Sequence, residues 1–467
     1  MSEKEITQDA QGETKQWGSR FGYIMVAAGA AVGLGNIWKF PYLAYQSGGG
    51  AFILSFILIA IVLAWPMVKV ETCIGRQGRA DMVSSFEKVN PKWGFVGWIA
   101  AVCTLCINFF YVVVGGWVLK YAFQYIVFGE QSFVGEGGDT VAFYESFTQS
   151  PLEPIVWTFI LLAGVMFLLL FGITDKVEKL VKVIMPALFI FLIICGVWIL
   201  FAIPGALDGL ATYLIPDFSN YTFKTFASAA TQVLFSVGIG WGIFTTLGAN
   251  VPKENNVSSD SALVVTCDAL VAIIAGFVVI PAATAFGTDV EAGPRLVFEV
   301  MTGVFANLPG GRILGIFFFV ALLFAVISSL FTFFEIPIRV FEEKLKMGRK
   351  KGVLVVALII FVGNIVVSLG FGPLMSVTLP WPLFPVGFEQ YDFYGWLDCF
   401  TAYLLLPAGV VLECCFVAKI WGWTRYNKEL SSDGQYKSIS AFEKVCIMVI
   451  NPILMIIVFL NVFGFIQ

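Results

Sequence analysis

At 467 residues the chain is long enough for about three soluble domains, but 58% of its residues are hydrophobic, only 13% are charged and its mean hydropathy is +0.87. These values are typical of a chain surrounded by lipid, and they exclude a soluble globular protein. The net charge of −4 says little about partners; a lipid bilayer is expected and a nucleic acid is not.

Apolar stretches long enough to cross a bilayer recur along almost the whole chain. We expect eleven transmembrane helices, with cores at 21–44, 51–73, 95–127, 153–172, 179–203, 224–248, 261–286, 312–338, 353–372, 396–420 and 443–465. Backbone groups in lipid must be hydrogen-bonded within their own segment, and the runs lack the alternation of a β-barrel. The sequence therefore predicts an all-α membrane protein.

The ends of the chain and its cysteines add little chemistry. The first twenty residues are polar, and the apolar run after them is too long for the centre of a signal peptide, so it is expected to be the first span. The nine cysteines fall mostly within predicted spans, which indicates no disulfide framework. Cys103 and Cys106 form a lone Cys-x-x-Cys, but without a second pair or any histidine we expect no zinc site.

The charged loops predict the orientation of the chain. Loop 343–352 is basic, with Lys344, Lys346, Arg349, Lys350 and Lys351, whereas loop 128–152 has four acidic residues and no lysine or arginine. By the positive-inside rule the first loop lies in the cytoplasm. We therefore expect a multi-pass protein of the inner (plasma) membrane with its N-terminus in the cytoplasm and its C-terminus outside.

Glycines cluster near the middle of two predicted spans, at 29–36 and 235–242. Each glycine costs a helix about 1 kcal/mol relative to alanine. Close packing between helices is one explanation, because small residues let membrane helices approach. The two clusters, however, lie five spans apart, and paired interrupted helices in inverted repeats indicate the binding site of a transporter.

An inverted repeat of five plus five helices would divide the chain in a simple way. We expect a cytoplasmic segment at 1–20, a first repeat at 21–203, a second, inverted repeat at 204–420, and a cytoplasmic loop with an eleventh helix at 421–467. An interrupted helix exposes carbonyl oxygens at one break end and N–H groups at the other. Such a break can hold a cation beside a carboxylate.

Residues 29–42 (GAAVGLGNIWKFPY), followed by 48–52 (GGGAF), closely resemble the first-helix signature of the neurotransmitter:sodium symporters. The resemblance covers roughly residues 17–420 and is to the bacterial branch, which includes leucine and aromatic or hydrophobic amino-acid transporters. It implies sodium-coupled import of a neutral amino acid by alternating access. The bacterial leucine transporter, in which interrupted helices hold substrate and sodium, belongs to this family, so the geometry expected here follows from the resemblance.

The resemblance implies two sodium sites made of oxygen ligands, which suit a hard cation. The first would use Ala31, Asn36, Ser236 and Asp268, together with the substrate carboxylate. The second would use Gly29, Val32, Ala325, Ser328 and Ser329. A pair of serines in a membrane helix otherwise serves to bind helices together.

Asp268 stands in the apolar run 263–270, where a carboxylate is costly without a partner. A cation is the expected partner. Many family members have asparagine at this position and require chloride to balance the sodium ions. The aspartate therefore predicts transport that does not depend on chloride.

The family resemblance also implies the substrate pocket and the gates. The pocket would be lined by Ala31, Gly33, Ile107, Tyr111, Phe235, Gly238, Trp241 and Phe333. Without the resemblance, aromatic residues in spans are mostly packing or interface residues. Gly238 leaves room at the pocket floor, and we expect a hydrophobic or aromatic amino acid.

The outer gate would pair Lys39, where arginine is more usual, with Asp398, and the inner gate would use Trp17 and Glu343. Ala249 and Asn250 replace the usual serine and tyrosine at the end of the sixth span. The resemblance therefore does not determine which side chains would contact one another at the inner gate. Glu71 is expected to brace the interrupted sixth span rather than to take part in transport.

Three classes of function compete. An enzyme is not supported, because the chain has no histidine and no nucleotide-binding loop. An uncoupled facilitator or channel of the same fold is the alternative, but a channel needs a continuous polar pore, whereas these oxygens converge on one level of the membrane. The sequence favours a sodium-coupled symporter without a cofactor other than its coupling ions.

Overall fold

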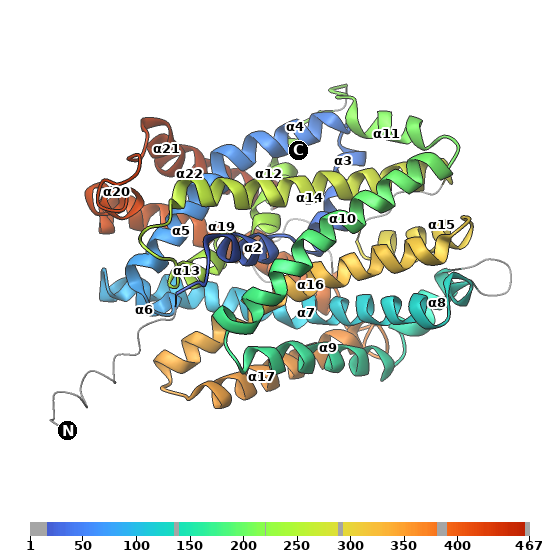
Figure 1. Ribbon diagram of the computed structural model, residues 1–467, viewed down its shortest axis with the longest axis horizontal. Helices are drawn as coiled ribbons and strands as arrows, with labels where there is room; N and C mark the ends of the chain where they lie inside the picture. Colours follow the sequence, from blue (N-terminus) through green and yellow to red (C-terminus); the bar gives the residue numbers. More distant parts are fainter. Residues whose placement is uncertain (1–15, 135–139, 220, 288–292, 381–389, 463–467) are drawn as a thin grey trace.

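The computed structural model describes residues 16–134, 140–219, 221–287, 293–380 and 390–462 as a bundle of long helices (Figure 1). The α-helices are α2 (Arg20–Ala31), α3 (Phe40–Gln46), α4 (Gly50–Ile59), α5 (Trp65–Gly78), α6 (Met82–Glu87), α7 (Gly94–Val127), α8 (Val141–Thr148), α9 (Glu153–Leu169), α10 (Glu178–Ala202), α11 (Ala206–Leu214), α12 (Phe223–Val237), α13 (Ile243–Gly248), α14 (Val257–Ala285), α15 (Met301–Ala306), α16 (Gly311–Lys344), α17 (Arg349–Gly370), α18 (Phe393–Phe400), α19 (Leu406–Cys415), α20 (Trp423–Leu430), α21 (Ala441–Val445) and α22 (Asn451–Val462).

Short π- and 3₁₀-helical turns join or extend these helices. They are η1 (Gly35–Lys39), η2 (Ala60–Ala64), η3 (Pro91–Trp93), η4 (Glu130–Phe133), η5 (Ile173–Val177), η6 (Leu296–Val300), η7 (Thr401–Leu405), η8 (Phe416–Trp421) and η9 (Cys446–Ile450). Two short antiparallel strands, β1 (Leu379–Pro380) and β2 (Gln390–Tyr391), pair Leu379 with Tyr391 and Pro380 with Gln390. The hairpin is a small addition to the predicted all-α fold.

The number of helices that can cross a membrane is consistent with the predicted eleven. Within the described residues, eight helical segments are long and apolar enough by themselves, and two bent pairs, α2 with η1–α3 (59°) and α8 with α9 (75°), raise the number to ten. The remaining predicted span, 224–248, is divided into α12 and α13, which are each too short to cross alone. The predicted interruptions in the first and sixth spans are therefore present.

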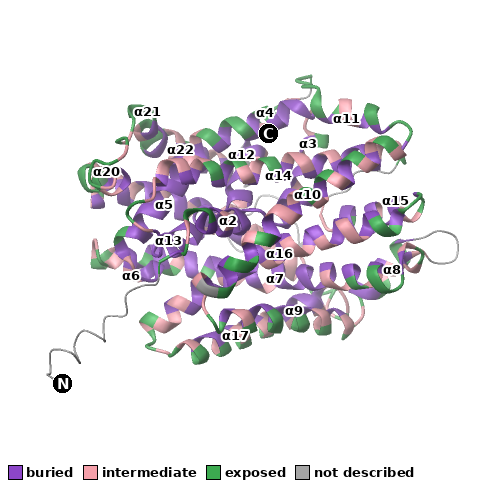
Figure 2. Cartoon of the chain, viewed as in Figure 1, coloured by how far each residue is buried: buried purple, intermediate pink, exposed green. Residues whose placement is uncertain are grey.

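The two interrupted spans lie inside the bundle. α2 packs against α10, α14 and α16, while α13 packs against α5 (Figure 1). Figure 2 shows buried residues along these central helices and exposed residues on outer helices such as α9 and α17. Exposed apolar side chains on the outer surface are what a lipid-facing protein requires. The repeat boundaries at 21–203 and 204–420 stay predictions.

Candidate functional site

The first interruption separates α2 from η1 by an extended residue. Val32 has φ −67° and ψ 107°, so the helix ends at Ala31 and resumes at Gly35. The last carbonyl oxygens of a helix have no partner within it. Here two of them, on Gly29 and Val32, face α16 and receive hydrogen bonds from Ser329, at 3.1 and 2.9 Å.

The predicted residues of the second sodium site gather at this point. The Ser329 hydroxyl also donates to the carbonyl of Ala325 at 3.0 Å, and Ser328 donates to the same carbonyl at 3.0 Å. Both serines are fully buried. A Cβ on Gly29 would lie only 2.9 Å from the Cβ of Ser328, so the glycine is needed for the close approach. We call these five residues, Gly29, Val32, Ala325, Ser328 and Ser329, the serine cluster.

A second group of oxygen-bearing residues, Ala31, Asn36, Ser236 and Asp268, corresponds to the predicted first sodium site; we call it the aspartate cluster. The Asn36 amide nitrogen lies 2.7 Å from Asp268 Oδ1 and 2.8 Å from Ser236 Oγ. Ser236 donates to both carboxylate oxygens of Asp268 at 2.9 Å. Asp268 is fully buried, has no basic partner in the described part of the chain, and is the one ionisable residue of the cluster.

The second interruption is held open by glycines and by Glu71. Gly238, Gly240 and Gly242 all have positive φ, at 78°, 82° and 76°, which other residues rarely adopt. The buried carboxylate of Glu71 accepts hydrogen bonds from the amides of Gly240 (2.6 Å) and Phe244 (3.2 Å). Glu71 therefore occupies the bracing position predicted for it, with Glu413 buried nearby.

A small cavity of about 10 Å³ lies between the two interruptions. Its lining includes the predicted residues Ala31, Gly33, Tyr111, Phe235, Gly238, Trp241 and Phe333, together with Ala30, Gly35, Asn36 and Ser236. Ile107 is the exception, since it is buried in the core but is not part of the lining.

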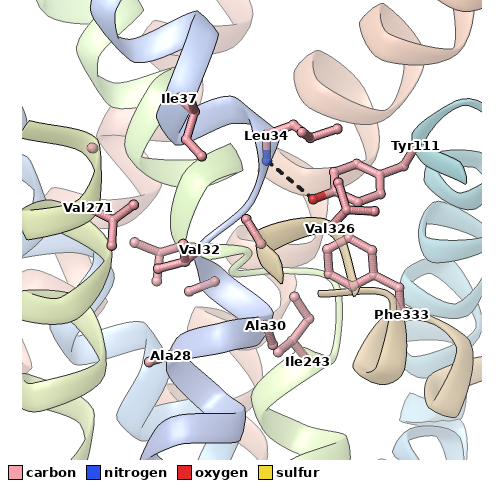
Figure 3. Packing of buried hydrophobic residues seen from close by; sticks show 14 of the residues in the cluster. Ala28, Ala30, Val32, Leu34, Ile37, Tyr111, Ile243, Val271, Val326 and Phe333 are labelled. Atoms are coloured by element: carbon pink, nitrogen blue, oxygen red, sulfur yellow. Dashed lines mark hydrogen bonds between the residues drawn. The ribbon is translucent and has the colours of Figure 1, made fainter. Parts of the chain in front are cut away.

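Aromatic rings fill most of the space around this cavity. The Phe333 ring lies beside that of Tyr111 (Figure 3), with the ring centroids 5.3 Å apart. It also lies beside Trp241, with the ring centroids 5.0 Å apart. The Tyr111 hydroxyl accepts a hydrogen bond from the amide of Leu34 at 3.2 Å. A Cβ on Gly33 would lie 2.9 Å from this hydroxyl, so glycine lets the tyrosine reach the interruption.

A larger cavity of about 320 Å³ lies beside the first and shares Gly35, Tyr111 and Phe235 with it. The side chains of Tyr111 and Phe235 therefore lie between the two cavities. Lys39 and Asp398 also line the larger cavity, with the ammonium 3.7 Å from the carboxylate. The Lys39 ammonium lies 5.0 Å from the centroid of the Phe235 ring. Lys39 and Asp398, the residues predicted for the outer gate, thus form an ion pair in the wall of the larger cavity.

The predicted inner-gate residues do not share partners. Trp17 is buried and bound to the end of the sixth span, because its indole donates to the Leu247 carbonyl (3.0 Å) and its amide to that of Asn250 (3.1 Å). Glu343 instead accepts from the amide of Asp81 at 2.7 Å, at the start of α6. The two residues therefore bind different elements, Trp17 the end of the sixth span and Glu343 the start of α6.

Other residues, which the sequence did not single out, complete the contacts at this end. Glu178 accepts from the amide of Gly18 at 2.9 Å, and Arg20 donates to Asp260 at 2.7 Å. Arg339 donates to the side chain of Asn250 at 2.6 Å. Asn250, which stands where a tyrosine is usual, therefore keeps a place in the network.

Glu335, for which the sequence suggested no role, is bound by two arginines. It pairs with Arg339 one turn later in α16 and with Arg349 at the start of α17. The only local signal for the pair of Glu335 and Arg339 was their spacing of four residues within one predicted span. Glu178 could have been noticed as an acid at the start of an apolar run.

Comparison with known proteins decides the family. The family model described as "Sodium:neurotransmitter symporter family" matches residues 14–129 and 150–467. The chain belongs to the sodium:neurotransmitter symporter family. It is 33% identical to an uncharacterized sodium-dependent transporter of Haemophilus influenzae, over 97% of this chain and 99% of the relative. It is 31% identical to the uncharacterized sodium-dependent transporter YhdH of Bacillus subtilis, over 96% and 98%.

The fold is also that of a solved family member. The crystal structure of MhsT in complex with L-phenylalanine matches with a TM-score of 0.86 and 32% identity, covering 96% of this chain and 99% of MhsT. The predicted membrane fold and family are thereby confirmed. The protein is a sodium-dependent symporter with a multi-pass membrane fold, and it is not an enzyme.

Proposed function

We propose that this symporter imports a hydrophobic or aromatic α-amino acid together with two sodium ions. The observation that carries the proposal is the meeting of the serine cluster, the aspartate cluster and the cavity at the two interrupted helices. We assign the N-terminus to the cytoplasm and the protein to the inner membrane on the distribution of basic loops.

The aspartate cluster would hold the first ion. Its donor set, with carboxylate, amide, hydroxyl and carbonyl oxygens, suits sodium. In the hydrogen-bonded arrangement the amide nitrogen of Asn36 points at Asp268, while its oxygen accepts from Gly33 at 2.9 Å. Binding of a cation would require the amide to turn, so that its oxygen replaces its nitrogen beside the carboxylate.

The serine cluster would hold the second ion. Three carbonyl oxygens already converge on the Ser329 hydroxyl, each within 3.1 Å. A cation at this point would accept the same lone pairs, and the hydroxyl hydrogen would turn away. The cluster is neutral, so its ion would depend on the dipoles of the backbone carbonyls and the serine hydroxyls alone.

The substrate would occupy the cavity between the interruptions. Tyr111, Trp241 and Phe333 supply an apolar surface, and MhsT, which shares the fold, was solved with L-phenylalanine. A cavity of about 10 Å³ holds no amino acid, so the aromatic side chains must separate for substrate to enter. The Tyr111 hydroxyl and the amides near Leu34 would bind the substrate carboxylate.

We further infer that chloride is not needed. Asp268 supplies a fixed negative charge where a neutral residue would leave two cations uncompensated in a site of low dielectric constant. Initial uptake rates with chloride or gluconate test this inference. Equal rates are expected, and loss of uptake in gluconate would contradict it.

Two sodium ions are energetically sufficient for accumulation. Each ion that enters down a tenfold gradient at about 100 mV releases roughly 1.4 kcal/mol from concentration and roughly 2.3 kcal/mol from potential. Two ions together release about 7 kcal/mol. At about 1.4 kcal/mol per tenfold, this supports up to about 10⁵-fold accumulation of a neutral solute.

The test is uptake of a panel of labelled amino acids into proteoliposomes with an inward sodium gradient. We expect the highest uptake for hydrophobic or aromatic amino acids and no accumulation when potassium replaces sodium. Protein-free liposomes are the control. Downhill flux of the same amino acid without sodium would instead favour an uncoupled facilitator.

A further inference from the structure

The outer surface carries an apolar groove of about 530 Å³ between α9 and α17. None of its lining residues belongs to the interrupted helices. The two helices run side by side at one edge of the bundle (Figure 1), and exposed residues lie along both (Figure 2). Phe167 and Leu354 in its wall are 59% and 71% exposed. Pockets of roughly 300–1,000 Å³ hold small organic ligands. In a membrane, lipid has direct access to this groove.

One end of the groove is basic. Lys350 is the only charged residue that lines it among the residues the structure describes. Lys176 lies at the same end, with its ammonium 3.5 Å from the centroid of Phe171, next to the lining residue Leu170. The end is fixed in place because Arg349 donates to the Leu169 carbonyl at 2.7 Å, which ties the start of α17 to the end of α9.

The two lysines are available for an external anion. Arg349 beside them is paired with Glu335, but neither lysine has an acidic partner among the described side chains. Both lysines are exposed. A lysine can lay its methylene chain along an apolar surface and place its ammonium at the level of lipid headgroups.

A second lipid-facing groove, of about 370 Å³, lies between α19 and α22 and provides a comparison. Its lining, which includes Leu404, Val411 and Ile456, has no charged residue within the described chain. This groove offers an acyl chain the same apolar contact, but no partner for a headgroup.

We propose that the groove between α9 and α17 binds an anionic phospholipid, with its acyl chains against the apolar wall and its phosphate between Lys176 and Lys350. The charge complementarity selects the headgroup, and the apolar wall selects a lipid over a soluble anion. The site is separate from the sodium and substrate sites, so its test does not depend on the transported substrate.

Native mass spectrometry of the purified full-length protein tests the proposal with dioleoyl phosphatidylglycerol and dioleoyl phosphatidylcholine. We expect the first lipid to bind with higher occupancy than the second. The double variant Lys176→Ser/Lys350→Ser should lower the affinity for phosphatidylglycerol at least about fivefold, which is the effect of roughly one lysine near an anionic headgroup. Lys437→Ser, at an exposed lysine elsewhere, is the matched control and should change nothing.

A second pair of variants tests the groove itself. Ala163→Trp, at an exposed position of the lining, should fill the groove and remove the preference for phosphatidylglycerol, whereas Ala408→Trp in the second groove should keep it. Equal occupancy of the two lipids in the wild type would mean non-selective contact and overturn the proposal. Loss of self-association in Ala163→Trp with unchanged lipid binding would assign the groove to a second copy of the chain, and would also overturn it.

Discussion

The serine cluster and the aspartate cluster lie on either side of the same interruption, yet they are built differently. The serine cluster has no charge and consists of three backbone carbonyls and two hydroxyls. The aspartate cluster contains a buried carboxylate that is bound by Asn36 and Ser236 and lies next to the cavity. Binding of an ion to the neutral cluster would depend on the positions of its oxygen atoms, whereas binding to the charged cluster would depend on electrostatic attraction. Mutations should therefore affect the two in different ways.

The largest effect is expected from Asp268→Asn. The amide keeps an oxygen for a cation but removes a full charge, and a charge at about 4 Å is worth about 4 kcal/mol at an effective dielectric constant near 20. We expect the affinity for sodium to fall at least about 100-fold, measured by the sodium dependence of uptake. A variant with unchanged sodium affinity would show that Asp268 compensates no cation.

Tyr111→Phe should come next, at the cavity that lies beside both clusters. Loss of one hydrogen bond to a buried carboxylate costs about 1.5–3 kcal/mol, which is about 10- to 100-fold in substrate affinity. Equilibrium binding of the transported amino acid measures the effect. Tyr121→Phe on the same helix is the control, because its hydroxyl has no hydrogen-bond partner within the described residues. An affinity loss below twofold would exclude the hydroxyl as a ligand.

Ser329→Ala tests the neutral cluster. One uncharged ligand is removed, so we expect a loss of about 1.5 kcal/mol, or roughly tenfold in sodium affinity, with the substrate pocket unchanged. The same sodium titration applies. Ser368→Ala is a matched control at a buried serine of α17. If both variants behave like the wild type, the serine cluster only binds helices together.

The smallest effect is expected at the outer gate. Lys39 and Asp398 are each about a quarter exposed and lie 3.7 Å apart, and such pairs are worth about 0–1 kcal/mol. Asp398→Asn should therefore change the apparent substrate affinity less than about fivefold in an uptake assay. A loss as large as that of Asp268→Asn would mean that the pair is essential for closing the cavity.

The residues of both clusters could be named from the sequence because most of them lie in two local glycine-rich strings or in a pair of adjacent serines, and because Asp268 is a charged residue in an apolar run. Ser328 and Ser329 are neighbours in one helix, and the carbonyls of Gly29 and Val32 follow from the helix break. These features depend on short stretches of chain, so a family motif identifies them.

The inner end was predicted less well because its contacts join distant segments. Glu343 binds the amide of Asp81, and Glu178 binds that of Gly18, across 262 and 160 residues. Which acid meets which amide depends on the packing of helices, and no local pattern records it. The same reason explains Ile107, whose helix was predicted but whose side chain is buried in the core and is not part of the cavity lining.

Sodium-dependent binding of substrate tests the central claim most directly. The measurement is equilibrium binding of the amino acid that the uptake panel selects, to purified wild-type protein, as sodium replaces potassium at constant ionic strength. If the ions and the substrate share the interrupted helices, each must raise the affinity for the other. We expect binding to be lost in potassium and to return as sodium rises. Binding that is equally tight in the two salts would contradict the account.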